Sequence, residues 1–315
     1  HRFIMDYLME EVLTREPEDV RDFLIKTSVL KRLSGPLCEA VTGAEDGDAM
    51  LQRLERRNLF IVPLDDERRW YRYHHLFADL LKARLYEKGP ARAASLLSRA
   101  SAWCEAQGQI ESAVNYALTA DDHERAADLV ARYWHHTANK GEIQTVWSWL
   151  QALPQDTIRN SALLGLAYCW ILWLSGRIDA IEPHLLAAEA ALEGTDPGPL
   201  ENHLGAHLQS PPDLPAHLAV LRSFVSSHRG EYHEAVAHAR RGLRLAPADL
   251  PAQEEAQLRT TAHLALAAAH GAAGQLEPAV EAYEETIRWS IAGSNPTGLA
   301  VTQRLVHVLR VLGRL

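Results

Sequence analysis

The chain has 315 residues, 47% of them apolar, and a formal net charge of −9. That length allows two domains with separate cores, and the negative charge argues against non-specific nucleic-acid binding by the chain as a whole. No apolar run has the length of a membrane span and no signal peptide opens the sequence, so we expect a cytoplasmic protein with no membrane partner. The cysteines Cys38, Cys104 and Cys169 lack metal-ligand spacing and are predicted to be buried thiols.

Four helical segments are predicted before residue 58. They cover residues 3–15, 17–28, 34–43 and about 46–58. Pro17 and Pro36 suit first turns, Ser34 and either Asp46 or Asp48 suit N-caps, and Gly43 suits a helix end. These four helical segments precede a β-hairpin.

A single β-hairpin is predicted directly after these helices. Residues 59–64 and 70–73 are short runs of strand-forming residues, and the charged stretch 65–69 between them is a solvated turn. After Tyr73 the apolar period changes to that of a helix, with a stripe formed by Leu76, Phe77, Leu80, Leu81 and Leu85. Helices, a hairpin and a further helix in this order are typical of a winged-helix domain, which we place at residues 1–88, including a preceding linker helix.

From residue 89 to 315 the pattern predicts TPR-like helical repeats. A Gly, polar, apolar motif recurs at Gly108, Gly141, Gly176, Gly230 and Gly274, and Gly313 begins a sixth copy. The spacings of 33, 35, 54, 44 and 39 residues bracket the period of about 34 that TPR repeats show. Glycine after a helix adopts the left-handed conformation that ends it, so each motif marks the turn inside a helical hairpin.

The widest spacing contains an insertion at about residues 194–215, whose prolines and glycines predict a surface loop. The expected fold class is therefore mainly α: a small winged-helix domain with one β-hairpin, followed by a TPR-like right-handed α-superhelix truncated at its C-terminus. Such a stack leaves a concave surface for ligands or partners.

Aromatic residues concentrate between residues 133 and 173, and most are predicted to pack between helices. Four of them, Trp134, Trp147, Trp170 and Trp173, are candidates for lining a ligand or partner groove. No metal site is predicted, because His135–His136 and the pair His203/His207 lack a third ligand at a matching spacing. No catalytic motif occurs either, so no enzyme activity is expected.

Four N-terminal segments carry a family resemblance. They are Phe-Leu-Ile-Lys-Thr-Ser-Val-Leu (residues 23–30), Leu-Cys-Glu-Ala-Val-Thr-Gly (37–43), Leu-Glu-Arg-Arg-Asn-Leu-Phe (54–60) and Tyr-Arg-Tyr-His-His-Leu-Phe-Ala-Asp-Leu-Leu (71–81). Together they resemble the large ATP-dependent LuxR-type transcriptional regulators typified by MalT. In that family a P-loop ATPase module precedes the winged helix, TPR-like repeats follow it, and a C-terminal helix-turn-helix domain binds DNA.

The resemblance implies that this chain is the central part of such a regulator. No Gly-x-x-x-x-Gly-Lys-Ser/Thr loop is present, so ATP or ADP is expected only in the full-length protein, and DNA binding only through a C-terminal domain outside this chain. The expected partners are a small-molecule inducer or regulatory protein on the concave repeat surface, and the nucleotide-binding domain of the same protein. The repeats would sense the signal, and the winged helix would relay it.

One residue receives a nucleotide role from the resemblance. In related signal-transduction ATPases a histidine after the hairpin contacts the β-phosphate of ADP, and His74 lies at that place, although Tyr73 and His75 depart from the family's flanking Met and Asp. An imidazole N–H beside free helix N–H groups suits a phosphate. The alternative interpretation is that His74 and His75 only satisfy helix-end carbonyls or pack on Trp70.

Two other functions stay open at this point. The chain could be a TPR scaffold without a nucleotide role, or the winged helix could bind DNA directly. Six arginines lie between residues 53 and 72, but four acidic residues lie among them and three of these are at the hairpin tip. A DNA-binding wing needs a cleaner positive face.

Overall fold

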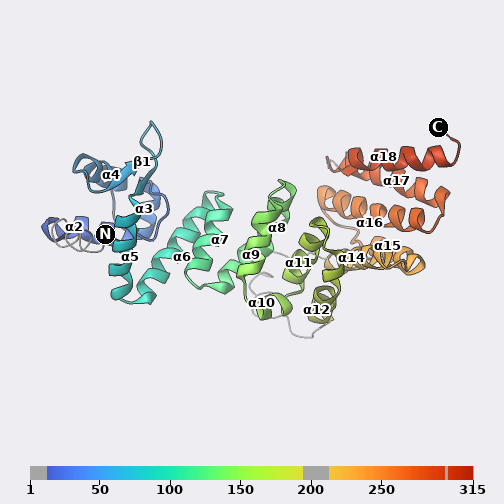
Figure 1. The fold of residues 1–315 in the computed structure, drawn as a ribbon, viewed down its shortest axis with the longest axis horizontal. Helices are drawn as coiled ribbons and strands as arrows, with labels where there is room; N and C mark the ends of the chain where they lie inside the picture. The colour runs from blue at the N-terminus through green and yellow to red at the C-terminus, as the bar shows by residue number, and fades with distance from the viewer. Residues whose placement is uncertain (1–12, 194–212, 295–296, 315) are drawn as a thin grey trace. The chain divides into compact units, whose positions relative to one another are not determined.

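The computed structural model describes residues 13–193, 213–294 and 297–314 (Figure 1). It divides into two compact units, His1–Leu129 and Val130–Leu315. Within the described residues the only sheet is a two-stranded one, and all other regular elements are helices. The helix expected over residues 3–15 lies almost entirely outside the described part.

The first unit contains the expected winged helix and one helical hairpin. Its elements are α2 (Glu18–Thr27), α3 (Gly35–Thr42), α4 (Gly47–Arg56), β1 (Ile61–Pro63), β2 (Tyr71–Tyr73), α5 (His75–Glu87), α6 (Pro90–Ala106) and α7 (Ile110–Thr119). The strands are antiparallel, with Ile61 opposite Tyr73 and Pro63 opposite Tyr71. The charged turn predicted between them forms the hairpin tip.

A third short segment extends this hairpin. Leu33 and Tyr71 exchange both backbone hydrogen bonds at 2.8 Å, so the loop before α3 pairs with β2. Nothing in the sequence predicted this bridge, because a single residue has no periodicity. Leu33 is fully buried, so the bridge fastens the hairpin to the helical core.

Two predicted helix starts are at the right positions, but the predicted N-cap hydrogen bonds are wrong. Ser34 precedes α3 and Asp46 precedes α4, yet neither side chain makes a capping hydrogen bond. Instead Asp48 Oδ1 accepts from the Gly35 N–H at 3.1 Å, and Glu39 Oε1 accepts from the Gly47 N–H at 2.8 Å. Each helix is therefore capped by a side chain of the other, because Gly35 and Gly47 allow their backbones to meet.

Helix α8 (His123–Asn139) runs across the division at residue 129, and the second unit continues with further helices. They are α9 (Ile143–Ala152), α10 (Gln155–Arg159), α11 (Ala162–Leu174), the 3-10 turn η2 (Ile178–Ala180), α12 (Ile181–Glu193), α14 (Leu214–His228), α15 (Tyr232–Leu245), α16 (Ala252–Ala272), α17 (Leu276–Ala292) and α18 (Thr297–Val311). Sequential helices pack as hairpins, most closely α14 with α15 and α16 with α17.

The repeat glycines have the predicted conformation. Gly108, Gly141, Gly176, Gly230 and Gly274 have φ between 69° and 86°, and Gly313 has φ 67°. Each follows the first helix of a hairpin, where a residue with a Cβ would be strained. The expected fold class, a winged helix followed by TPR-like repeats, is confirmed.

The predicted insertion loop, 194–215, is too long at its end. Residues 194–212 lie outside the described part, but α14 already begins at Leu214, with Asp213 before it and Pro215 in its first turn. Proline is compatible with a first turn because that position needs no N–H donor. The prediction of a loop as far as residue 215 is therefore wrong for Leu214 and Pro215, which form the first turn of α14.

Candidate functional site

The sequence-predicted nucleotide contact, His74, lies at the N-terminus of α5. Its backbone N–H donates to Phe60 O at 2.7 Å, and its carbonyl accepts from the Ala78 N–H at 3.0 Å, so the backbone is fixed by β1 and α5. The imidazole is exposed, and its ring centroid lies 4.5 Å from that of His75. The Trp70 ring carries the Arg32 guanidinium at 5.0 Å, and the ring contact of His74 among the described residues is with His75.

This end of α5 has the donors that an anion needs. The amide groups before Ala78 have no intrahelical acceptor, as at every helix start. His74 and His75 add two exposed imidazoles beside them. The structure holds no ligand contact for His74, so its nucleotide role stays a prediction.

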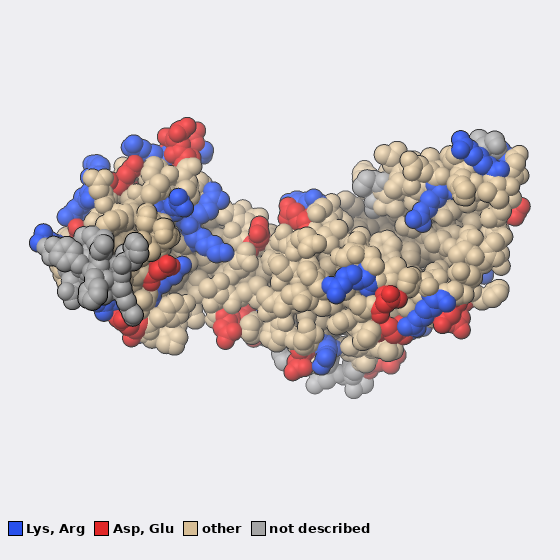
Figure 2. Space-filling view, viewed as in Figure 1, with Lys and Arg blue, Asp and Glu red and all other residues tan. Residues whose placement is uncertain are grey.

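The hairpin tip lacks a clean basic face. Arg68 pairs with Glu55 at 3.5 Å and Arg69 pairs with Glu67 at 3.2 Å. Asp65 closes the turn by accepting from the N–H groups of Arg69 and Trp70. Figure 2 shows a group of acidic side chains over the hairpin tip, where DNA phosphates would have to approach.

The winged helix is fastened to the first helical hairpin within the same unit. Arg92 of α6 pairs with Asp22 of α2 at 3.0 Å, and Arg99 of α6 donates to the carbonyl of Val41 at 3.2 Å. The hydroxyl of Tyr116 on α7 accepts from the Lys31 N–H at 3.2 Å, and burial raises the pKa of Tyr116 to about 12. These contacts join the winged helix to the hairpin formed by α6 and α7.

In the second unit, two of the four candidate tryptophans lie together. The Trp173 ring is 5.5 Å from Trp170 and 4.6 Å from Phe224 of α14, while Trp170 is 6.3 Å from Phe224. Trp170 is 7% exposed and Trp173 is partly exposed. This aromatic cluster links α11 to α14.

The other two candidates belong to different surroundings. Trp147 contacts Tyr168 at 5.4 Å and carries Arg177 over its ring at 5.0 Å. Trp134 is buried and its ring contact is with His135. The structure therefore does not assemble the four tryptophans into one lining.

A buried acid–histidine pair lies beside the aromatic cluster. His217 Nε2 and Asp213 Oδ2 are 3.0 Å apart, and the His217 ring approaches Trp170 edge-on at 6.2 Å. The Asp213 side chain is only 7% exposed, yet its Oδ1 has no hydrogen-bond partner among the described residues, and neither has His217 Nδ1. A buried oxygen without a hydrogen bond costs about 1–3 kcal/mol. A group that donates a hydrogen bond to Asp213 Oδ1 would therefore be stabilising here.

His135 of α8 is a further polar residue close to Asp213 and His217. Gln257 of α16 donates its side-chain amide to His135 Nε2. Burial, assisted by His217, lowers the pKa of His135 to about 4, so its imidazole is neutral at pH 7. Burial is the largest single influence on Asp213 and would raise its pKa, but the hydrogen bond and the electrostatic interaction with His217, together with smaller contributions, outweigh it and the pKa is lowered. Asp213 is therefore ionised.

We call the set His135, Trp170, Asp213, His217 and Gln257 the Asp213 cluster. Of this set, the sequence predicts only Trp170 as a candidate for binding. Asp213 and His217 are four residues apart, which places them on one helix face, but the predicted insertion loop covers Asp213 and the start of α14. His135 enters the sequence analysis only as half of a rejected metal pair.

The remaining candidates are the histidine pairs and the three thiols. No group of three or more metal-ligating side chains occurs in the described part, and His203 and His207 lie outside it. The three thiols are buried as predicted, and burial raises the pKa of Cys104 to about 11 and that of Cys169 to about 12. No helix among the described residues is both long and apolar enough for a membrane span.

The fold and these contacts define a winged-helix domain that continues into helical repeats. Residues 9–93 match the family model of the MalT winged helix domain. A segment of 168 residues, 53% of the chain, is 40% identical to the serine/threonine-protein kinase PknK of two Mycobacterium tuberculosis strains and of Mycobacterium bovis. The match spans only 15% of the length of those relatives.

One solved structure aligns over 96% of the chain and 54% of its own. It is a signal transduction ATPase with numerous domains that carries a tetratricopeptide repeat sensor, from Pyrococcus horikoshii. The sequence identity is 13% and the TM-score is 0.39. A similarity of that size does not establish a shared fold.

Proposed function

We propose that this chain is the regulatory sensor segment of an ATP-dependent transcriptional activator of the LuxR type, acting in the cytoplasm. In this proposal the repeats bind an inducer or partner protein, and the winged helix relays the bound state to a nucleotide-binding domain of the full-length protein. One observation carries it: a segment that matches the MalT winged helix domain is fastened directly to the first helical hairpin of a repeat array.

The Asp213 cluster is the proposed inducer site. A ligand that donates one hydrogen bond to Asp213 Oδ1 would satisfy the buried carboxylate, and Trp170 would provide an apolar wall. The expected ligand is therefore a small molecule with a hydroxyl or ammonium donor.

His74 is the proposed contact to ADP in the resting state. Its exposed imidazole and the free amide groups of α5 suit a phosphate, and its backbone is held between β1 and α5. An inducer that prefers the ADP-free form would lower the affinity for ADP, and by linkage ADP would lower the affinity for the inducer by the same factor.

A metabolite screen tests the sensor part. Thermal unfolding of this chain is measured with each compound for the wild type and for Asp213→Asn, which keeps the shape but removes the charge. An inducer should raise the Tm of the wild type and have little effect on the variant. Hits that stabilise both proteins equally would place the inducer site elsewhere.

A second measurement tests the relay. The affinity of the full-length protein for ADP is measured with and without a hit compound, and we expect a change of at least fivefold. An unchanged ADP affinity would favour the alternative function, a TPR scaffold without a nucleotide role.

A further inference from the structure

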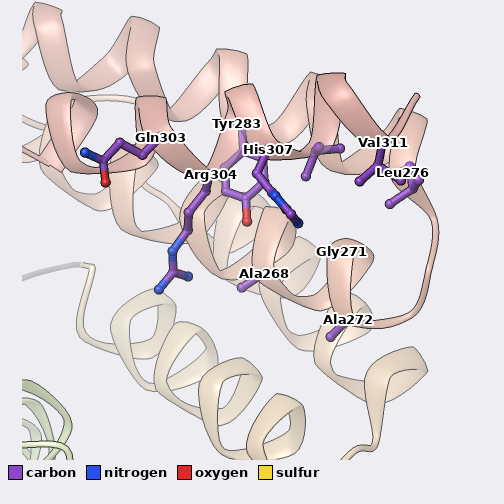
Figure 3. Close-up of a pocket in the computed structure, with 10 residues that line it drawn as sticks. Ala268, Gly271, Ala272, Leu276, Tyr283, Gln303, Arg304, His307 and Val311 are labelled. Atoms are coloured by element: carbon purple, nitrogen blue, oxygen red, sulfur yellow. The ribbon is translucent and has the colours of Figure 1, made fainter. Parts of the chain in front are cut away.

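A second candidate site lies at the other end of the repeats, between α16, α17 and α18. A groove of about 470 Å³ is bounded by these three helices (Figure 3). Its lining consists of Ala268, Gly271, Ala272, Leu276, Tyr283, Gln303, Arg304, His307, Val308 and Val311. None of the Asp213 cluster residues contributes to it.

The α16 side of the groove is formed by residues with almost no side chain: Ala268, Gly271 and Ala272. Glycine inside a helix costs about 1 kcal/mol relative to alanine. Helix packing does not require it here, because a Cβ on Gly271 would lie 4.0 Å from the Ala279 Cβ, an ordinary contact distance. A small wall instead lets the backbone of a bound chain approach closely.

The α18 side presents hydrogen-bond donors. Figure 3 shows Arg304 extending from α18 toward the side of α16, with His307 and Tyr283 near each other beside it. Arg304 is exposed and forms no ion pair or hydrogen bond with the described residues. Gln303 and His307 are exposed as well.

Charge is segregated across this repeat. No carboxylate lines the groove, and α18 contains no acidic residue. The four glutamates of α17 lie outside the lining: Glu277, Glu281 and Glu284 are exposed, and Glu285 is partly exposed and pairs with Arg288 at 2.7 Å. Figure 2 shows basic side chains over the region of α18. The groove is therefore complementary to a ligand with negative charge.

The geometry points to a short acidic segment of a partner protein, bound in extended conformation along α18 with a carboxylate on Arg304. From Gln303 to Val311 the helix rises about 12 Å, which equals three to four residues of an extended peptide. Such a chain would place its backbone against the small residues of α16 and its acidic side chains toward Arg304 and His307. The inference rests on the proposed function, in that it names the class of partner protein that the repeats bind.

Fluorescence polarisation with a labelled, end-capped hexaglutamate peptide tests the inference on this chain. We expect saturable binding that weakens as salt rises from 50 to 300 mM, and no binding of capped hexaglutamine. Arg304→Gln should weaken binding at least fivefold. The matched variant Arg244→Gln removes an exposed arginine on α15, outside the groove, and should change binding less than twofold.

A second variant tests the groove rather than the charge. Gly271→Leu fills the space beside α16 and should abolish binding while circular dichroism shows the helices intact. Equal binding by wild type and Arg304→Gln, or no binding of hexaglutamate by the wild type, overturns the inference. Competition by free glutamate as effective as by the unlabelled hexapeptide would also overturn it, because the ligand would then be a small anion.

The outcomes of the peptide assay do not depend on whether the winged helix relays a signal to a nucleotide-binding domain. The peptide assay contains no nucleotide, so its failure leaves the ADP measurement untouched. A loss of ADP coupling with peptide binding intact would instead contradict the proposed function.

Discussion

The winged helix and the repeats treat their buried polar groups differently. In the winged helix the buried hydroxyls of Tyr73 and Thr27 lie 2.7 Å apart in a hydrogen bond, and the Tyr71 hydroxyl reaches Glu55. In the repeats the buried Asp213 keeps one oxygen without a partner among the described residues.

The winged helix also leaves the buried Ser34 Oγ without a hydrogen bond among the described residues, but that group is a neutral hydroxyl, and its buried Glu16 Oε2 pairs with Arg57 at 2.8 Å. In the repeats the unsatisfied atom belongs to a carboxylate, for which a missing hydrogen bond costs more, so a ligand that donates one would stabilise this region more. The difference suits the proposed roles of a relay and a sensor.

Breaking the core of the winged helix should give the largest effect. Leu81 of α5 is fully buried, so Leu81→Ala is expected to lower the free energy of unfolding of the first unit by about 3 kcal/mol. Leu76, in the same helix, is 39% exposed, and Leu76→Ala should cost less than about 1 kcal/mol. Urea unfolding followed by circular dichroism measures both, and equal losses would show that α5 is not packed as described.

The repeats should lose stability in acid through His135. Its pKa is lowered to about 4 in the folded chain, so the unfolded chain binds more protons between pH 6.5 and 4. Stability is therefore complete above about pH 6.5 and falls by up to about 3 kcal/mol toward pH 4. Tryptophan fluorescence during urea unfolding at several pH values measures this decrease.

Other partly buried histidines, such as His263, also have a lowered pKa, so the diagnostic quantity is the difference between variants. His135→Gln should flatten the pH dependence, whereas the exposed neighbour in His136→Gln should leave it as in the wild type. The same slope in all three proteins would show that His135 is not buried in the folded state.

Replacing each of two glycines, three residues apart, by alanine should change the stability of the chain in opposite directions. Gly274 has φ 73°, so Gly274→Ala is expected to cost about 1–2 kcal/mol through backbone strain. Gly271 is inside α16 with room for a methyl group, so Gly271→Ala should stabilise by about 0.5–1 kcal/mol. Thermal unfolding of the two variants gives the comparison, and a loss in both would place a steric contact at Gly271.

The smallest effects compare a helix cap in each region. Ser161 accepts a hydrogen bond from the Leu164 N–H at 3.3 Å, so Ser161→Ala should cost about 1 kcal/mol in the repeats. Ser34 occupies the same position before α3 without such a bond, and Ser34→Ala should be nearly neutral in the winged helix. Similar losses in urea unfolding would mean that Ser34 caps α3 in solution.

Much of the fold could be predicted because it depends on local signals. The glycine turns, the hairpin around residues 65–69 and the apolar stripe of α5 each follow from a few neighbouring residues. The bridge between Leu33 and Tyr71 and the exchanged caps of α3 and α4 could not be predicted, because they join positions that only the tertiary fold brings together. The domain boundary at residue 88 stays a prediction.

The candidate sites were less accessible to sequence reasoning. Trp170 and Trp173 were both candidates for lining a groove, and their rings lie 5.5 Å apart, since residues three apart along a helix lie on one side. Asp213 and Gln257 come from helices far apart in the sequence, and no spacing rule joins them to His135. The groove beside Arg304 was missed because alanines and a glycine leave no sequence signal for a ligand.

The central claim is that the winged helix helps to hold ADP in the resting state. The rate of ADP release from the full-length protein tests this claim most directly. A fluorescent ADP analogue is bound, and its dissociation rate is measured for the wild type, His74→Ala and His75→Ala. The account predicts that His74→Ala releases the analogue at least tenfold faster, while His75→Ala stays within twofold of the wild type. Equal rates in all three proteins would contradict it.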